Sequence, residues 1–306
     1  MVTSPLQLSI IIVNYNSGAY ALKCISSLQK QLNIRFEIIL VDNASQDNSI
    51  DLFKDNLPDN CLFIQSKENL GFGRANNLAA SKARGEFLLL LNPDTEIDDP
   101  FAISNLIDTL VSNPKVGLLA PLVYEPRKNK LVLPRYSYPS SSGLKYTQKF
   151  KALPGKIAWV LGACMLIKRS VYEEIKGFDP DYFLYGEDAD ICLKVRLAGY
   201  EIGFIDTVKI MHVSGASEAS ASSLDKWLRK RRGVFLFVTK HFDPRDALRL
   251  TKTSIFKSKC YLLALKIKGL FLDQNNPSYI DKKHRLQATI IAAEEVVHLL
   301  NAPRQN

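Results

Sequence analysis

The sequence has no run of 18 or more apolar residues, so we expect no membrane-spanning helix. Its 306 residues include only 15 glycines and 14 prolines, which excludes a collagen-like or low-complexity chain. The first nine residues lack the basic and apolar stretches of a secretory signal. The five cysteines are widely spaced, with no CxxC pair, so we expect neither a disulfide framework nor a zinc knuckle. These absences predict a globular protein in a reducing cytoplasm.

The charge of the chain is concentrated near its end. Residues 1–225 hold 23 Lys and Arg against 25 Asp and Glu, whereas residues 226–306 hold 17 against six, a net charge of +11. Such a surface suits an anionic partner, although it could also be a solvated face. Because aromatic residues are few there and no nucleic-acid motif is present, the pattern favours an anionic membrane surface and no nucleic acid.

Short apolar runs alternate with helical patterns through the first 120 residues. We expect strands at residues 8–13, 37–41, 61–64 and 86–91, and helices at 19–31 and 74–83. This alternation is typical of βαβ units and a parallel sheet. Further along, residues 124–156 read as a long loop that could act as a lid, residues 159–167 and 201–205 as strands, and the region after residue 225 as helical.

Polar residues follow the predicted strands. Asn14, Asp42 and Asp94 each come at or just after a strand end, where ligands bind in open α/β sheets. Because the chain has neither GxGxxG nor GxxxxGK[ST], a nucleotide would be held by such side chains. Asp42 could accept from a base imide or a ribose hydroxyl, or simply cap a helix. Asp94 could bind Mg²⁺ beside diphosphate oxygens.

A dense acidic cluster and one histidine complete the candidate chemistry. Glu187, Asp188 and Asp190 precede a helical pattern, so a carboxylate there could act either as a general base or as a helix cap. His212 follows a predicted strand. A single histidine of this kind is either structural or a metal ligand on the same rim.

Six ordered blocks of sequence resemble family 2 glycosyltransferases of the GT-A fold, particularly the bacterial rhamnosyltransferase-like group. The blocks lie at residues 9–17, 41–49, 69–77, 89–97, 162–200 and 211–217. The resemblance implies an α/β, Rossmann-like, mostly parallel sheet flanked by helices. It places a catalytic domain at residues 1–225, with donor binding in about 1–120 and acceptor binding and catalysis in 121–225. Residues 226–306 would form a basic helical C-terminal extension.

The resemblance also implies roles for single residues. Asp188 matches the catalytic base and Glu187 its acidic neighbour, while Asp94 and His212 match metal-binding positions. Asn92 stands where the family's DxD motif begins, which is a departure from that motif. We assign the acceptor side to Trp159 and Tyr185. The donor-binding positions are Asn14, Asp42, Arg74, Asn92 and Asp94.

The implied reaction is an inverting, metal-dependent sugar transfer. The donor would be a dTDP- or UDP-linked sugar, rhamnose among the possibilities, the cofactor Mg²⁺ or Mn²⁺, and the acceptor a hydroxyl of a glycan or lipid-linked glycan. We expect a cytoplasmic protein, peripheral on the inner face of the plasma membrane. A sugar-nucleotide nucleotidyltransferase and a non-catalytic glycan-assembly scaffold are the alternatives.

The C-terminal extension carries two features of its own. Residues 229–232 (RKRR) form a basic cluster. An apolar stripe at helical spacing, flanked by Lys259 and Lys266, could lie in a membrane interface or pack on the catalytic body. The stripe consists of Phe256, Cys260, Leu263, Ile267 and Leu270.

Overall fold

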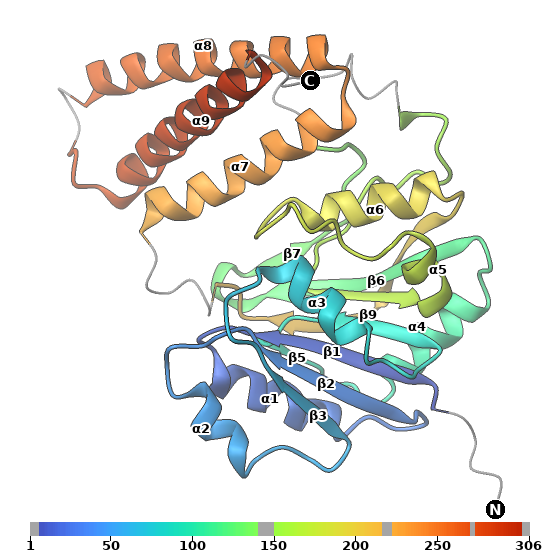
Figure 1. Cartoon of the computed structure of the whole chain (residues 1–306). Coiled ribbons are helices and arrows are strands. Elements are labelled where there is room, and N and C mark those ends of the chain that lie inside the picture. Colours follow the sequence, from blue (N-terminus) through green and yellow to red (C-terminus); the bar gives the residue numbers. More distant parts are fainter. Residues whose placement is uncertain (1–5, 140–149, 216–221, 270–272, 302–306) are drawn as a thin grey trace, which may run out of the picture. The chain divides into compact units, whose positions relative to one another are not determined.

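The computed structural model describes residues 6–139, 150–215, 222–269 and 273–301 (Figure 1). The chain divides into two compact units. The first comprises residues 1–138, 153–183 and 187–219, and the second comprises residues 139–152, 184–186 and 220–306. The predicted loop residues 140–143 and the stripe residue Leu270 lie outside the described part of the chain.

The first unit is an α/β structure. Its strands are β1 (Leu8–Asn14), β2 (Phe36–Asp42), β3 (Cys61–Gln65), β4 (Phe87–Leu91), β5 (Thr95–Glu96), β6 (Val116–Glu125), β7 (Lys130–Val132), β8 (Cys164–Lys168) and β9 (Glu201–His212). Its helices are α1 (Gly18–Leu28), α2 (Ser49–Lys54), α3 (Phe72–Ala80), α4 (Ala102–Val111), the 3₁₀ helix η1 (Pro126–Lys128), α5 (Arg169–Glu174) and α6 (Glu187–Leu197).

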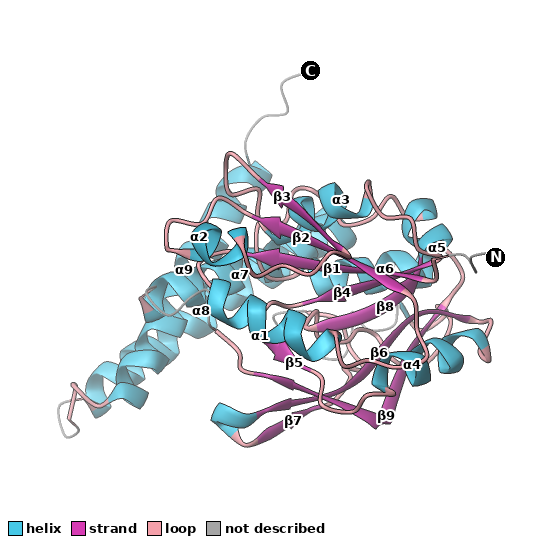
Figure 2. Cartoon of the chain, turned by 90° about the horizontal axis from the view of Figure 1, so that it is seen from below, coloured by secondary structure: helices cyan, strands magenta, loops and turns pink. Residues whose placement is uncertain are grey.

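The strands form one sheet in the order β3-β2-β1-β4-β8-β6-β9-β5, with β7 beside β6 (Figure 2). The pairs β2–β3, β1–β2, β1–β4 and β6–β9 are parallel. The pairs β4–β8, β6–β8, β6–β7 and β5–β9 are antiparallel. The α/β class is therefore confirmed, but the sheet is mixed rather than mostly parallel, because β8 enters its middle in the reverse direction.

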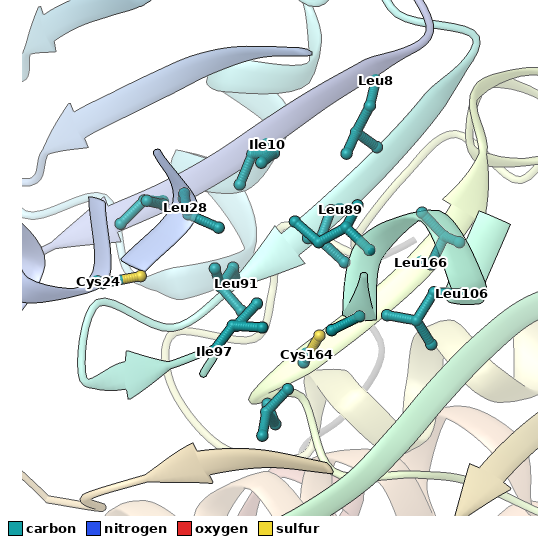
Figure 3. Close-up of a cluster of buried hydrophobic side chains, with 14 of the residues drawn as sticks. Leu8, Ile10, Cys24, Leu28, Leu89, Leu91, Ile97, Leu106, Cys164 and Leu166 are labelled. Atoms are coloured by element: carbon teal, nitrogen blue, oxygen red, sulfur yellow. The ribbon is translucent and has the colours of Figure 1, made fainter. Parts of the chain in front are cut away.

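Alternating side chains of the central strands build a core on each face of this sheet. In β1, Ile10 and Ile12 join the cluster that includes α1 and α4, whereas Ile11 and Val13 join the cluster that includes α3, α5 and α6. Figure 3 shows the first of these clusters, with Leu89 and Leu166 from neighbouring strands. Burial on both faces explains why these strands read as continuous apolar runs rather than alternating ones.

The later part of the first unit departs from the sequence prediction at three places. The predicted strand at 159–167 begins only at Cys164, because the chain turns at Gly162 and Ala163 before it enters the sheet. The strand expected at 201–205 continues to His212. The predicted loop at 124–156 contains β7, which pairs with β6. An apolar run shows burial but not where the backbone turns, and this is why these boundaries were wrong.

The second unit contains three helices, α7 (Ser223–His241), α8 (Pro244–Lys268) and α9 (Pro277–Asn301) (Figure 1). Ser222 caps α7 by accepting a hydrogen bond from the Asp225 backbone N–H at 3.1 Å. Phe235 of α7 packs with Ala292 and Ala293 of α9 in a small apolar cluster. None of the helices in the described residues is both apolar enough and long enough to cross a bilayer.

Candidate active site

Strands β1 and β2 end together in a buried polar network. Asn14 lies opposite Asp42 in the parallel register, and neither residue is exposed. The Asp42 carboxylate accepts hydrogen bonds from the Asn14 amide at 2.9 Å and from the Ser45 hydroxyl at 2.6 Å. The Ser45 backbone N–H donates to its other oxygen at 3.0 Å. The network holds the loop that follows β2 in a fixed conformation.

Asp42 does not cap a helix. The next helix, α2, begins at Ser49 and has Asn48 at its N-cap position, so the capping interpretation of Asp42 was wrong. The reason is that the chain makes a separate polar turn after β2, with Ala44 at φ 62°, before the helix starts. One oxygen of Asp42 carries a single protein donor in this network, which leaves it acceptor capacity toward a ligand.

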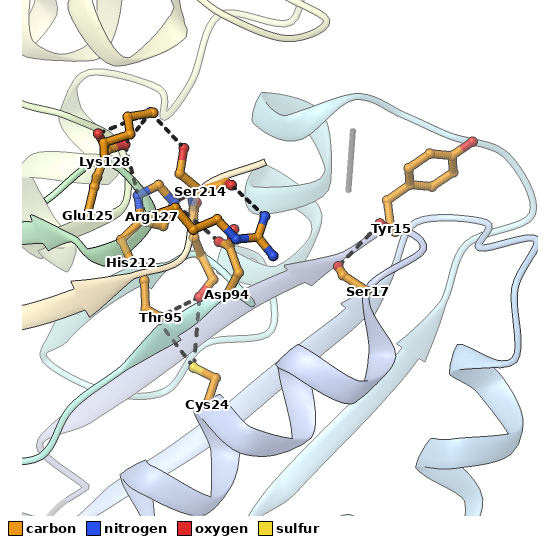
Figure 4. A network of polar contacts seen from close by, with 11 residues as sticks. Tyr15, Ser17, Cys24, Asp94, Thr95, Glu125, Arg127, Lys128, His212 and Ser214 are labelled. Carbon is orange, nitrogen blue, oxygen red and sulfur yellow. Dashed lines mark hydrogen bonds and ion pairs between the residues drawn. The ribbon is translucent and has the colours of Figure 1, made fainter. Parts of the chain in front are cut away.

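A second polar group forms where β4, β5 and β9 meet (Figure 4). Thr95 of β5 pairs with His212, the last residue of β9, and this pairing brings the imidazole to Asp94. His212 Nε2 lies 3.2 Å from Asp94 Oδ1 and 3.3 Å from the Asn92 side-chain nitrogen. Asp94 and His212 are both buried. The other ring nitrogen of His212, Nδ1, has no hydrogen-bond partner among the described residues.

The side chains of Asp94 and His212 can be considered as ligands of a divalent cation. No group of three or more His, Cys, Asp or Glu side chains able to hold a metal occurs in the described ranges. Asp94 and His212 nevertheless supply one carboxylate oxygen and one imidazole nitrogen at close range. Mg²⁺ takes few protein ligands when diphosphate oxygens and water fill its remaining positions, and Mn²⁺ accepts oxygen ligands as well as imidazole. The pair therefore fits a cation that arrives with a diphosphate, rather than a cage built by protein alone.

The acidic cluster lies at the start of α6. Glu187 and Asp188 are in its first turn, where the helix dipole favours a charged carboxylate. Burial raises the pKa of Asp188 to about 6, even though backbone N–H groups of Ala189 and Gly162 act to lower it. Burial, and then the charge of Asp188, raise the pKa of Glu187 to about 8. Burial therefore disfavours ionisation of both neighbouring carboxyl groups, and of Glu187 more strongly than of Asp188.

The mixed topology brings this helix start to the same edge as Asp94. Strand β8 runs antiparallel to β4, with Cys164 opposite Leu91, and the Asn92 backbone N–H donates to the Ala163 carbonyl at 2.9 Å. Gly162, the residue before Ala163, faces Asp188: a Cβ built on it would lie 3.4 Å from the Asp188 Cβ. The segments carrying Asp94, His212 and Asp188 therefore meet at one edge of the sheet.

Arg74 belongs to a separate set of contacts, around Pro180. It is exposed at the start of α3, and its Nε donates to the Pro180 carbonyl at 2.7 Å. Arg74 lines a cavity of about 140 Å³ together with Asn69 and Phe183. Its hydrogen bond to Pro180 does not test a role in donor binding, which stays a prediction.

The two predicted acceptor residues are held by other contacts. The Trp159 indole N–H donates to the Ser137 carbonyl at 3.0 Å, and its backbone bridges Arg135. Tyr185 has a left-handed backbone, φ 71°, and its ring lies under the Lys230 ammonium at 5.0 Å. Neither contact tests a role in acceptor binding.

Sequence reasoning missed a cationic group beside His212. Lys128 Nζ donates to Glu125 at 3.0 Å and to the Ser214 hydroxyl at 3.3 Å (Figure 4). Arg127 donates to the Tyr20 hydroxyl at 3.0 Å and to the Ser214 carbonyl at 3.5 Å. The signal was present, since Glu125 ends a strand as Asp42 does, but these residues fell in the segment interpreted as a loop.

The cysteines offer no nucleophile at this edge. Burial raises the pKa of the Cys24 thiol to about 12, and Cys164 is shifted in the same direction by the same cause. Cys24 contacts the Asn92 carbonyl and the Thr95 hydroxyl at 3.8 and 3.5 Å. Both thiols therefore stay protonated near neutral pH and serve as small core residues, as the sequence predicted.

Comparisons with known proteins bear on the family and the fold of this chain. Residues 9–176 match the family described as Glycosyl transferase family 2, and residues 106–273 match Glycosyl transferase family group 2. The chain is 24% identical over 233 residues to N-acetylglucosaminyl-diphospho-decaprenol L-rhamnosyltransferase of Mycobacterium tuberculosis, covering 67% of this chain and 75% of that protein. It is 29% identical to the low-salt glycan biosynthesis hexosyltransferase Agl10 of Haloferax volcanii, covering 82% of each.

Solved structures with a similar fold include the mannosyltransferase PcManGT from Pyrobaculum calidifontis in complex with GDP-Man and Mn²⁺. It aligns with a TM-score of 0.59 and 18% identity, covering 97% of this chain and 88% of that one. Residues 1–349 of TarS from S. aureus in complex with UDP-GlcNAc align with a TM-score of 0.53 and 15% identity, covering 95% and 92%. At this identity the likeness concerns the fold alone.

Proposed function

Since this chain belongs to glycosyl transferase family 2 and is a glycosyltransferase, we propose that it transfers a deoxyhexose or hexose with inversion, using Asp188 as general base. The donor is a nucleoside-diphosphate sugar, and the acceptor is a hydroxyl of a lipid-linked glycan. Relatives whose names specify rhamnosyl transfer, one of them to a diphospho-decaprenol-linked sugar, support this choice of substrates. Family membership favours this reaction over the nucleotidyltransferase and scaffold alternatives.

The observation that carries the proposal is the acidic pair at the start of α6. A general base must be ionised at the working pH and yet be able to hold a proton, and a pKa of about 6 gives Asp188 both properties. It takes the proton of the acceptor hydroxyl as the oxygen attacks the anomeric carbon. The bond to the diphosphate breaks on the opposite face, so that the configuration is inverted without a covalent enzyme intermediate.

The other residues of the edge bind and orient the leaving group. Asp94 and His212 would hold a divalent cation, which when bound offsets the negative charge that develops on the diphosphate. Arg127, on the neighbouring 3₁₀ helix, is exposed and provides a further positive charge close to His212. Asn14 and Asp42 would contact the nucleoside.

A thermal-shift panel tests the donor and the cation together. Nucleoside diphosphates of thymidine, uridine and guanosine are added with Mg²⁺, with Mn²⁺ or with a chelator, and the midpoint of unfolding is measured. We expect the thymidine or uridine compound to raise the midpoint and the cation to enlarge that shift. Stabilisation by the guanosine compound alone, or none by any of the three, would contradict the proposed donor class.

A transfer assay then tests the acceptor. The protein is given the selected donor with a polyprenyl-diphosphate-linked sugar or with the same sugar lacking the lipid, and the anomeric configuration of the product is determined by NMR. Product with retained configuration would refute the inverting reaction.

A further inference from the structure

Helix α8 has an unusual distribution of residues. The side it buries within the second unit includes small and hydroxyl side chains beside Leu250 and Leu265, whereas several of its other large apolar side chains are exposed. Thr251 and Ser254 are buried and bond to carbonyls of their own helix, Ala247 and Leu250, at 2.7 and 3.0 Å. Hydroxyls satisfied in this way can pack against α9, which lies beside α8 (Figure 1).

The outward apolar residues form one stripe, which we call the α8 face. Its members are Phe256, Cys260, Leu263 and Ile267, which follow one another at intervals of four, three and four residues. Phe256 is 70% exposed, Leu263 61% and Ile267 55%. Such large apolar side chains normally lie inside a folded unit, so a contiguous exposed row of them marks an interaction surface. The row spans about 16 Å along the helix.

The α8 face is bordered by positive charge. Lys257 and Lys268 lie along one side of it, and Lys259 and Lys266 along the other; all four are exposed. Over its whole length α8 has seven Lys and Arg against a single Asp, Asp246. Of these four lysines, Lys259 forms an ion pair within the second unit, with Glu294 of α9 at 2.8 Å.

We propose that the α8 face inserts into the interfacial layer of an anionic lipid bilayer, with its flanking lysines at the level of the headgroups. Charge complementarity favours an anionic membrane as the partner of the α8 face. Pairing two copies of the chain through this face would oppose two strongly basic helices, which costs free energy, whereas an anionic membrane attracts both. The long lysine side chains place their methylene groups beside the apolar row and their ammonium groups in water or on phosphate. The inference does not depend on which sugar is transferred.

Vesicle flotation with the full chain tests the proposal. The vesicles contain phosphatidylcholine alone or an equal mixture with phosphatidylglycerol, and the bound fraction is measured at low and at high salt. We expect binding to the mixed vesicles at low salt, weaker binding at high salt, and little binding to phosphatidylcholine. Equal binding to both vesicles, or none to either, would overturn the proposal.

Two sets of variants separate the apolar from the ionic contribution. Replacing Phe256, Leu263 and Ile267 with Gln should lower the partition coefficient at least about tenfold, because their apolar surface no longer enters the lipid. The matched control changes Leu32, Val111 and Leu133, which are 50%, 57% and 59% exposed in the first unit, to Gln. A triple variant of the α8 face that binds as the unmodified protein does would refute the insertion.

The lysine variants carry their own control. Replacing Lys257 and Lys266 with Gln should lower binding to the mixed vesicles by about 25-fold, since each lysine near an anionic surface contributes about fivefold. Replacing Lys30 and Lys115 with Gln removes the same net charge from exposed positions of the first unit and should change vesicle binding much less. Equal losses from both pairs would show that net charge alone is responsible, which would contradict docking through α8.

Two further measurements distinguish the other outcomes. Sedimentation velocity without vesicles detects self-association, and a dimer that the triple variant alone converts to monomer would assign the α8 face to a second copy instead. Circular dichroism and transfer to the lipid-free acceptor check that every variant is folded. These readouts keep a failure of membrane binding separate from a failure of the proposed reaction.

Discussion

The pH dependence of transfer offers the most direct test of the acidic pair. An aspartate at its ordinary pKa of 3.8 would be ionised across the usable pH range, whereas burial raises the pKa of Asp188 to about 6. The ionised fraction is then about 0.9 at pH 7 and about 0.1 at pH 5, so kcat/KM should fall roughly tenfold between these values if Asp188 is the base. Because Glu187 and Asp188 interact, the profile reports apparent pKa values of the pair.

Replacing Asp188 with Asn should remove both the rate and this acid limb. Loss of a positioned general base lowers the rate by about 10²–10⁴, which corresponds to about 3–5 kcal/mol of transition-state stabilisation. The assay measures release of the nucleoside diphosphate at saturating donor from pH 5 to 8.5. The matched control is Asp206→Asn, an exposed aspartate on β9, which should leave the profile unchanged.

Two results would refute this reasoning. The first is a folded Asp188→Asn variant that transfers sugar at the unmodified rate. The second is an acid limb near pH 4, which would mean that the base lies in water rather than in the partly buried pair at the start of α6.

Three further changes probe other parts of the structure. Glu187→Gln should stabilise the fold increasingly as the pH rises from about 4.5 toward 8, by about 4 kcal/mol at pH 8, because burial raises the folded-state pKa of Glu187 and so penalises its ionisation. Equal urea midpoints for both proteins at pH 8 would contradict this. Arg196→Met should lower the free energy of unfolding in urea by about 3–5 kcal/mol, because the buried guanidinium donates to the carbonyls of Pro154, Leu153 and Gly155 at 2.8–3.1 Å. A loss below about 1 kcal/mol would show that these hydrogen bonds contribute little to stability. Asp94→Asn should abolish the additional thermal shift that Mg²⁺ gives in the presence of nucleoside diphosphate, and an undiminished shift would place the cation elsewhere.

The first half of the fold could be predicted from sequence because its central strands β1, β2 and β4 are buried and run parallel. Residues 8–13 read as a continuous apolar run and form the centre of β1, which ends at Asn14. A parallel strand must leave the sheet at the same edge as its neighbour, so Asn14 and Asp42 could be placed together from their positions after the runs alone. What each side chain contacts there, such as Ser45 with Asp42, required the structure.

The second half was less predictable because an apolar run does not indicate the direction in which its strand will run. Nothing in residues 159–167 indicates that β8 runs antiparallel, although this direction puts Gly162 at the edge where β4 ends. The contact of His212 with Asp94 depends in turn on the pairing of β9 with the two-residue strand β5. Such pairings join residues more than 70 positions apart, where only tertiary packing decides.

The turn that leads into α6 belongs to the same unit as the C-terminal helices. Tyr185 and Gly186 both have positive φ, 71° and 96°, and they directly precede Glu187 and Asp188 in the chain. Within the second unit, Gly233 of α7 lies against this turn, since a Cβ there would come within 2.0 Å of the Tyr185 carbonyl oxygen. A glycine inside a helix lowers stability by about 1 kcal/mol relative to alanine. Here the close approach of the Tyr185 backbone explains why glycine occupies the position. Within the second unit, helix α7 therefore supports the left-handed turn formed by Tyr185 and Gly186.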